Sequence, residues 1–180
     1  DLPTLVSNVV NNVAEQVAWR ELYDQLIQTR ILPHINPEGK PLTVYYPGAG
    51  ADIIRPIRAT AATRYVYLDE VHMGLRGFDH LERLFRDSGA VDIKMVLRDS
   101  ETAVYSFKYP RSDGLLVPRE VVYYAAKDAR SFLPAELHLG YDVLFAHHSP
   151  VGLVSASAEE IELLLSNLRP GGYIFETPII

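Results

Sequence analysis

A short glycine loop, Gly48-Ala49-Gly50, follows an apolar run that ends at Pro47 and precedes a segment with helical character. Glycine lets a chain turn tightly and lets a ligand approach the backbone without a Cβ in the way. A dinucleotide-binding fingerprint needs a third glycine three residues after Gly50, where Ile53 stands, and the Gly-Lys-Ser/Thr of a phosphate-binding loop is missing. The loop therefore predicts a backbone contact with a ligand other than a pyrophosphate, and the alternative is a tight turn without a ligand.

Two carboxylates, Asp69 and Glu70, come directly after the apolar run Tyr65 to Leu68. A carboxylate at the end of a strand can accept two hydrogen bonds from the vicinal hydroxyls of a ribose. Both residues could instead belong to a solvated turn. The glycine loop one element earlier makes the ligand-binding interpretation about as well supported as the solvated turn.

A third carboxylate, Asp128, lies just past the apolar run Val121 to Ala125. It could accept a hydrogen bond from the exocyclic amine of an adenine, while the backbone N–H of Ala129 donates to a ring nitrogen. Asp128 is equally suited to cap a short helix around residues 132–137. The sequence leaves both roles open.

Two histidines, His147 and His148, follow the apolar run Tyr141 to Ala146. An imidazole at the carboxyl end of a strand could act as a general base or a metal ligand. Neighbouring residues of a strand point to opposite faces, so the two rings are not expected to chelate one ion. We predict no metal site, and a general base at one of the two histidines.

Apolar runs of strand and helix type alternate along the chain, which predicts an α/β fold with a mostly parallel sheet covered on both faces. Ligands of such sheets bind beyond the carboxyl ends of the strands. Residues 91–118 are expected to hold an inserted β-hairpin and a polar loop, Pro110 to Pro118. The expected strands are Leu42–Tyr46, Tyr65–Leu68, Val91–Leu97, Thr102–Tyr109, Val121–Ala125, Tyr141–Ala146 and Tyr173–Glu176, and the expected helices are residues 4–30, one from Ala51, Phe78–Phe85 and Ala158–Leu168.

Length, composition and net charge indicate the number of domains and argue against some partners. A chain of 180 residues with 48% hydrophobic and 22% charged residues has room for one domain, with residues 1–40 as a helical segment packed on residues 41–180. The net charge of -6 argues against a nucleic-acid partner, and no apolar run is long enough to span a membrane. Cysteine is absent, which excludes disulfides and thiolate chemistry but does not fix the compartment. A cytoplasmic location is favoured, removal of a signal peptide stays open, and the oligomeric state is not determined.

In order along the chain, these pieces resemble the class I S-adenosylmethionine-dependent methyltransferases. The resemblance lies in four segments and covers most of residues 41–178. They are TVYYPGAGAD (residues 43–52), YVYLDE (65–70), KDARSFLP before YDVLFAHH (127–134 and 141–148) and LLLSNLRPGGYIFE (163–176). The last is the most diagnostic, because a helix that ends in Leu-Arg-Pro-Gly-Gly before an apolar strand is typical of the family.

The resemblance implies a three-layer Rossmann-like sheet with strand order 3-2-1-4-5. It also implies that S-adenosylmethionine is the cofactor and that a small molecule accepts the methyl group. Pro47 to Gly50 would pass under the methionine and ribose, Asp69 with Glu70 in reserve would hold the ribose hydroxyls, and Asp128 and Ala129 would contact the adenine. Ala146 to Ser149 would border the donor methyl, with His147 or His148 as the base where the acceptor must lose a proton.

Three departures keep other functions open. The family usually has an acidic residue two positions before the first glycine, where Tyr46 stands. The hairpin lengthens the path to the third parallel strand, and no counterparts of the family's sixth and seventh strands follow. The alternatives are a catalytically inactive binding or scaffold module with the same fold, and another Rossmann-like nucleotide-binding enzyme.

Overall fold

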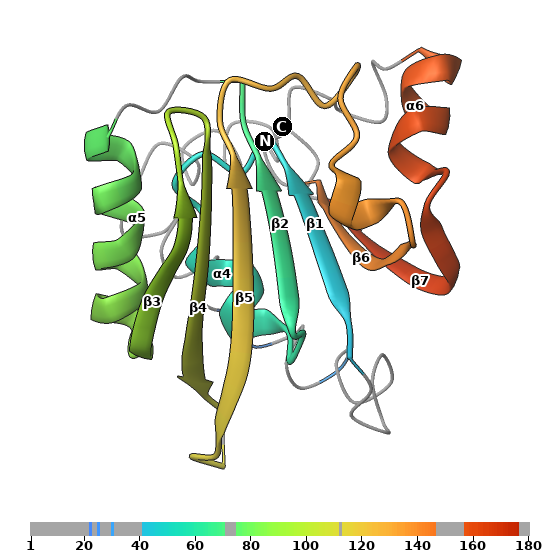
Figure 1. Ribbon diagram of the computed structural model, residues 1–180. Coiled ribbons are helices and arrows are strands. Elements are labelled where there is room, and N and C mark those ends of the chain that lie inside the picture. The colour runs from blue at the N-terminus through green and yellow to red at the C-terminus, as the bar shows by residue number, and fades with distance from the viewer. Residues whose placement is uncertain are drawn as a thin grey trace, which may run out of the picture.

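A seven-stranded mixed sheet forms the centre of the structure, a computed structural model that describes residues 41–70, 75–111, 113–146 and 157–176 together with Leu22, Gln25 and Arg30 (Figure 1). The sheet has the order β3-β4-β5-β2-β1-β6-β7. Its strands are β1 (Thr43–Pro47), β2 (Arg64–Leu68), β3 (Val91–Arg98), β4 (Thr102–Pro110), β5 (Leu116–Tyr124), β6 (Tyr141–Ala146) and β7 (Leu168–Glu176). The described helices are α4 (Ile54–Ala59), α5 (Leu75–Ser88), α6 (Ala158–Leu165) and the 3₁₀ helix η2 (Ala135–Leu137).

The sheet combines parallel and antiparallel pairs. Strand β1 lies between β2 and β6 and is parallel to both, β5 is parallel to β2, and β7 is parallel to β6. Strands β3 and β4 pair antiparallel, as do β4 and β5. The predicted α/β class and the inserted hairpin are confirmed. The predicted mostly parallel sheet with the order 3-2-1-4-5 is not, because the observed sheet has seven strands and includes two antiparallel pairings. The reason is that short turns join β3 to β4 and β4 to β5, and such turns permit only antiparallel pairing.

Two apolar clusters cover the two faces of the sheet. Alternate residues of one strand enter different clusters, so Val44 and Tyr46 pack with α4 and α5 whereas Tyr45 packs with η2 and α6. In Figure 1, α4 lies behind the sheet and η2 in front of it. Both faces of the central strands are therefore buried from solvent.

Burial of the strand tyrosines is deeper than the sequence predicts. Seven tyrosines of the predicted strands are expected to be half-buried, but only Tyr124 is. The other six are at most 1% exposed: Tyr45, Tyr46, Tyr65, Tyr67, Tyr105 and Tyr123. The difference arises because helices cover both faces of the sheet, so no strand face in its centre meets solvent.

Several predicted boundaries are wrong, among them the start of α4, which begins at Ile54 and not at Ala51. Residues 110–118 are not a loop throughout, because β5 begins at Leu116 and pairs with β4 from that residue. Pro118 is tolerated there because β2 pairs with β5 only from Glu120 onward, so β5 has a single neighbour at the proline. Likewise α6 ends at Leu165, and the segment Arg169 to Gly172 belongs to β7. The predicted helix over residues 4–30 lies outside the described residues, apart from Leu22, Gln25 and Arg30.

Candidate functional site

The glycine loop lies at the carboxyl end of β1, where it is fastened to the end of β2. The backbone N–H groups of Gly48 and Ala49 both donate to the carbonyl oxygen of Leu68, at 2.6 and 3.1 Å. Gly48 has φ 71° and Gly50 has φ 53°, in the left-handed region that only glycine enters without strain. The glycines are therefore required by the turn itself.

Three tyrosine hydroxyls donate hydrogen bonds from the core to residues of this loop. The three residues form one row across the sheet, because Tyr46 on β1 pairs with Tyr67 on β2, which pairs with Tyr123 on β5. The hydrogen bonds run from Tyr46 to Oδ2 of Asp52 (2.9 Å), from Tyr67 to the carbonyl of Ile53 (2.5 Å) and from Tyr123 to the carbonyl of Gly50 (2.7 Å). Burial raises the pKa of Tyr67 and, with the charge of Asp69, that of Tyr123, so both hydroxyls stay protonated as donors.

Asp69 connects the loops that follow three parallel strands. Its Oδ2 accepts a hydrogen bond from the N–H of Gly50 at 2.8 Å. Its own N–H donates to the carbonyl of Tyr124, and its carbonyl accepts from the N–H of Lys127, both at 3.0 Å. The structure thus brings Gly50 and Asp69 into direct contact, although the sequence indicated them separately.

Asp128 is held by an arginine that the sequence analysis did not single out. The Arg130 side chain donates from Nε and Nη2 to both carboxylate oxygens of Asp128, at 2.8–3.1 Å, and lies 3.6 Å from Glu70. This hydrogen bonding lowers the pKa of the Asp128 carboxyl. The Asp128 carbonyl also accepts from the N–H of Phe132 at 2.9 Å, so Asp128 closes a turn and does not cap η2 (Ala135–Leu137). Arg130 could have been noticed from its spacing, since an arginine two residues after an aspartate can reach back to it.

The remaining predicted site residues are small and mostly buried. Ala129 packs in the apolar cluster on the η2 face, and Ala146 ends β6 with 6% of its surface exposed. Pro47 is buried at the end of β1. His147 and His148 lie outside the described residues, so their predicted role as a base stays a prediction.

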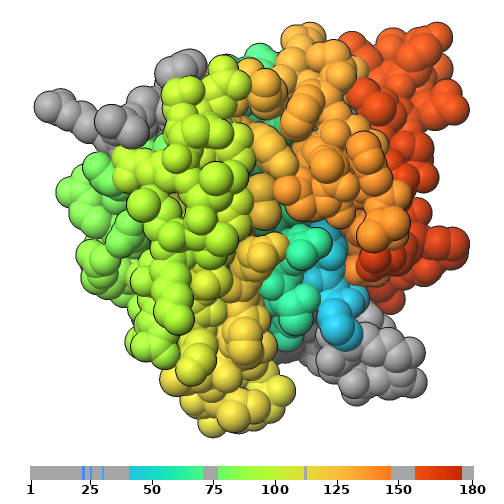
Figure 2. Space-filling view, viewed as in Figure 1, coloured from blue at the N-terminus to red at the C-terminus, as the bar shows by residue number. Residues whose placement is uncertain are grey.

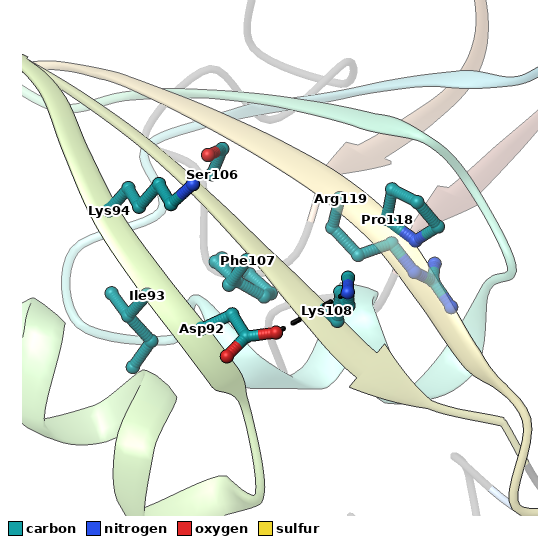
Figure 3. Close-up of a pocket in the computed structure, with 8 residues that line it drawn as sticks. All are labelled: Asp92, Ile93, Lys94, Ser106, Phe107, Lys108, Pro118 and Arg119. Atoms are coloured by element: carbon teal, nitrogen blue, oxygen red, sulfur yellow. Dashed lines mark ion pairs between the residues drawn. The ribbon is translucent and has the colours of Figure 1, made fainter.

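A hollow of about 380 Å³ lies elsewhere, over the first part of β3, the last part of β4 and the first part of β5 (Figure 3). Figure 2 shows these strands, in green to yellow, at the surface of the face seen in Figure 1. The hollow is lined by Asp92, Ile93, Lys94, Ser106, Phe107, Lys108, Pro118 and Arg119, and Lys108 is paired with Asp92 at 3.4 Å. Because Arg119 precedes the carboxyl end of β5 by five residues, the hollow is about 16 Å along the strand from the glycine loop.

Comparison with known proteins adds no relative: no protein-family model matches the sequence, and no curated protein matches it significantly. Within the described part of the chain, no group of three or more potential ligand side chains could hold a metal ion. No described helix is long and apolar enough to cross a membrane.

Proposed function

We propose that this chain binds S-adenosylmethionine and transfers its methyl group to a small-molecule acceptor. One observation supports the proposal most strongly, namely the contact between the glycine loop at the end of β1 and Asp69 at the end of β2. Strands β2 and β5 lie on one side of β1, while β6 and β7 lie on the other. A ligand of an open parallel sheet binds beyond the carboxyl ends at such a reversal of strand order.

The parallel part of the sheet is consistent with this function. We assign β5-β2-β1-β6-β7 to the order 3-2-1-4-5 of the methyltransferase fold, with β3 and β4 as an addition at the outer edge of β5. The short turns of the added strands leave the four parallel pairings intact. The assignment therefore needs no rearrangement of the core.

The residues around the loop fit this cofactor in part. Gly48 and Gly50 allow close approach of a ligand to the backbone, and Asp69 offers a carboxylate beside them for the ribose hydroxyls, with Glu70 as the second acid. The Asp128 carboxylate is already occupied by Arg130, so an adenine contact there would require the arginine to move. When bound, S-adenosylmethionine supplies a methyl group activated by its sulfonium. The chain's task is then to orient donor and acceptor in line.

An inactive binding module with the same fold is the second candidate. Two features favour it: Tyr46 stands where the family has an acid, and Arg130 neutralises Asp128. Such a module would keep the tyrosine-held loop as a structural element and would not bind the cofactor. Direct titration separates the two candidates.

The test is calorimetric titration of the chain with S-adenosylmethionine and with S-adenosylhomocysteine. We expect micromolar binding that becomes at least about tenfold weaker in Asp69→Ala, since a charge-assisted hydrogen bond is lost. Asp113→Ala is the matched control, because Asp113 is an exposed carboxylate paired with Arg111 at the far end of the β4–β5 hairpin. Absence of binding up to millimolar ligand refutes the proposal and favours the inactive module.

A further inference from the structure

Asp52, two residues after Gly50, has a carboxylate that is fixed through one oxygen only. Tyr46 donates to Oδ2 at 2.9 Å, and Nη1 of Arg55 lies 3.3 Å from the same oxygen. Both partners are buried, with Tyr46 1% and Arg55 6% exposed, whereas the Asp52 side chain is 30% exposed. Within the described ranges, the hydrogen bond and the ion pair of the Asp52 carboxylate both go to Oδ2, and neither goes to Oδ1. The result is a partly exposed carboxylate on the glycine loop that is held through Oδ2.

We infer that Asp52 binds the ammonium group at the amino-acid end of the ligand, an inference that rests on the function proposed above. An ammonium group offers charged donors, and a carboxylate is the acceptor that binds such donors most strongly. The neighbouring acids have other partners: Asp69 Oδ2 accepts from Gly50, and Asp128 is bound by Arg130. Asp52 is the acid that belongs to the loop itself.

Tyr46 is a positioning residue in this arrangement. Its ring packs in the core beside Phe145 at a centroid distance of 5.8 Å, so its hydroxyl has little freedom to move. The hydrogen bond from Tyr46 to Oδ2 fixes the Asp52 side chain and reduces the conformational freedom that this side chain must lose when a ligand binds. The tyrosine thus supplies orientation, while Asp52 supplies the charge.

The experiment compares two ligands that differ at the amino-acid end. S-adenosylhomocysteine has an ammonium group, and 5′-deoxy-5′-methylthioadenosine has the same nucleoside without one. Calorimetric titrations use the wild-type chain, Asp52→Asn and Tyr46→Phe, with Asp69→Asn as the matched control. Thermal unfolding of each variant verifies that it is folded.

We expect Asp52→Asn to weaken S-adenosylhomocysteine by about tenfold or more, while methylthioadenosine changes by less than about twofold. Tyr46→Phe gives a smaller loss with the same selectivity, and Asp69→Asn weakens both ligands alike. Equal losses for both ligands in Asp52→Asn, or no loss for either, overturn the inference while leaving the proposed function standing. A wild-type chain that binds neither ligand overturns both.

Discussion

Alkaline titration provides a sharp test of the tyrosine core. Burial is the first cause that raises the pKa of six tyrosines, each at most 1% exposed: Tyr45, Tyr65, Tyr67, Tyr105, Tyr123 and Tyr141. The folded state keeps these protons at pH values where the unfolded chain, with tyrosine pKa values of about 10, releases them. The free energy of unfolding is therefore unaffected below pH 10 and falls as the pH rises above it.

The size of the effect follows from the number of buried hydroxyls. One pH unit above the unfolded pKa, each tyrosine lowers the free energy of unfolding by about 1.4 kcal/mol, so six lower it by about 8 kcal/mol at pH 11. Small domains are stabilised by about 5–15 kcal/mol in total. We therefore expect the chain to unfold cooperatively within roughly one to two pH units above pH 10.

Two signals followed in one titration measure this transition. Phenolate absorbance near 295 nm should rise together with the loss of far-ultraviolet circular dichroism, because the buried hydroxyls ionise only on unfolding. Tyr67→Phe should lower stability at neutral pH by about 1–3 kcal/mol, since the Ile53 carbonyl loses its donor, and should make the alkaline dependence shallower by about 1.4 kcal/mol per pH unit. Ionisation of all the tyrosines near pH 10 with an unchanged dichroism spectrum would refute the reasoning.

Three further predictions concern stability, measured by urea unfolding. Arg119→Met should lower the free energy of unfolding by about 1–3 kcal/mol. The buried guanidinium donates to the Ala62 carbonyl at 2.5 Å, and the carbonyl would lose this donor. No loss of stability would show that the carbonyl finds another donor. Gly50→Ala should lower the free energy of unfolding by about 1–2 kcal/mol because of the φ of 53° alone. An added Cβ would lie 3.8 Å from its nearest neighbour, which is an ordinary contact distance. An unchanged free energy of unfolding would mean that the loop relaxes. Ser157→Ala should cost about 1 kcal/mol by removing the capping box with Glu160, and unchanged stability would contradict a role of α6 in the cooperative core.

The elements that the sequence predicts well are those with a strong local pattern. The hairpin over β3 and β4 was evident from alternation and the polar turn after Arg98, and β6 matches its prediction at both ends, Tyr141 and Ala146. The start of β5 at Leu116 was missed because a proline two residues on argues locally against a strand. Residues 116–118 form a strand despite the proline because they pair with β4, and a local sequence pattern does not show such a pairing.

The site was predictable in its residue types but not in its contacts. Spacing indicated the glycine loop and Asp69, because both follow strand-like runs. It could not show that Asp69 binds Gly50, since the contact spans 19 residues and depends on the register of β1 with β2. The hydrogen bond from Tyr46 to Asp52 could not be predicted either, because it depends on the path of the loop. The sequence showed Tyr46 only as a departure from a family pattern.

The row formed by Tyr46, Tyr67 and Tyr123 explains why core and site cannot be separated in this protein. Strands buried on both faces are usually rich in valine, isoleucine and leucine, none of which could reach the loop with a polar group. A tyrosine fills the same core position and also carries a hydroxyl to the backbone above it. Burial of each ring stabilises the core, and each hydroxyl forms a hydrogen bond that orders one part of the loop, from Gly50 to Ile53. Any ligand that binds there meets a loop whose shape is already set by the sheet, so the entropy cost of ordering it was met during folding.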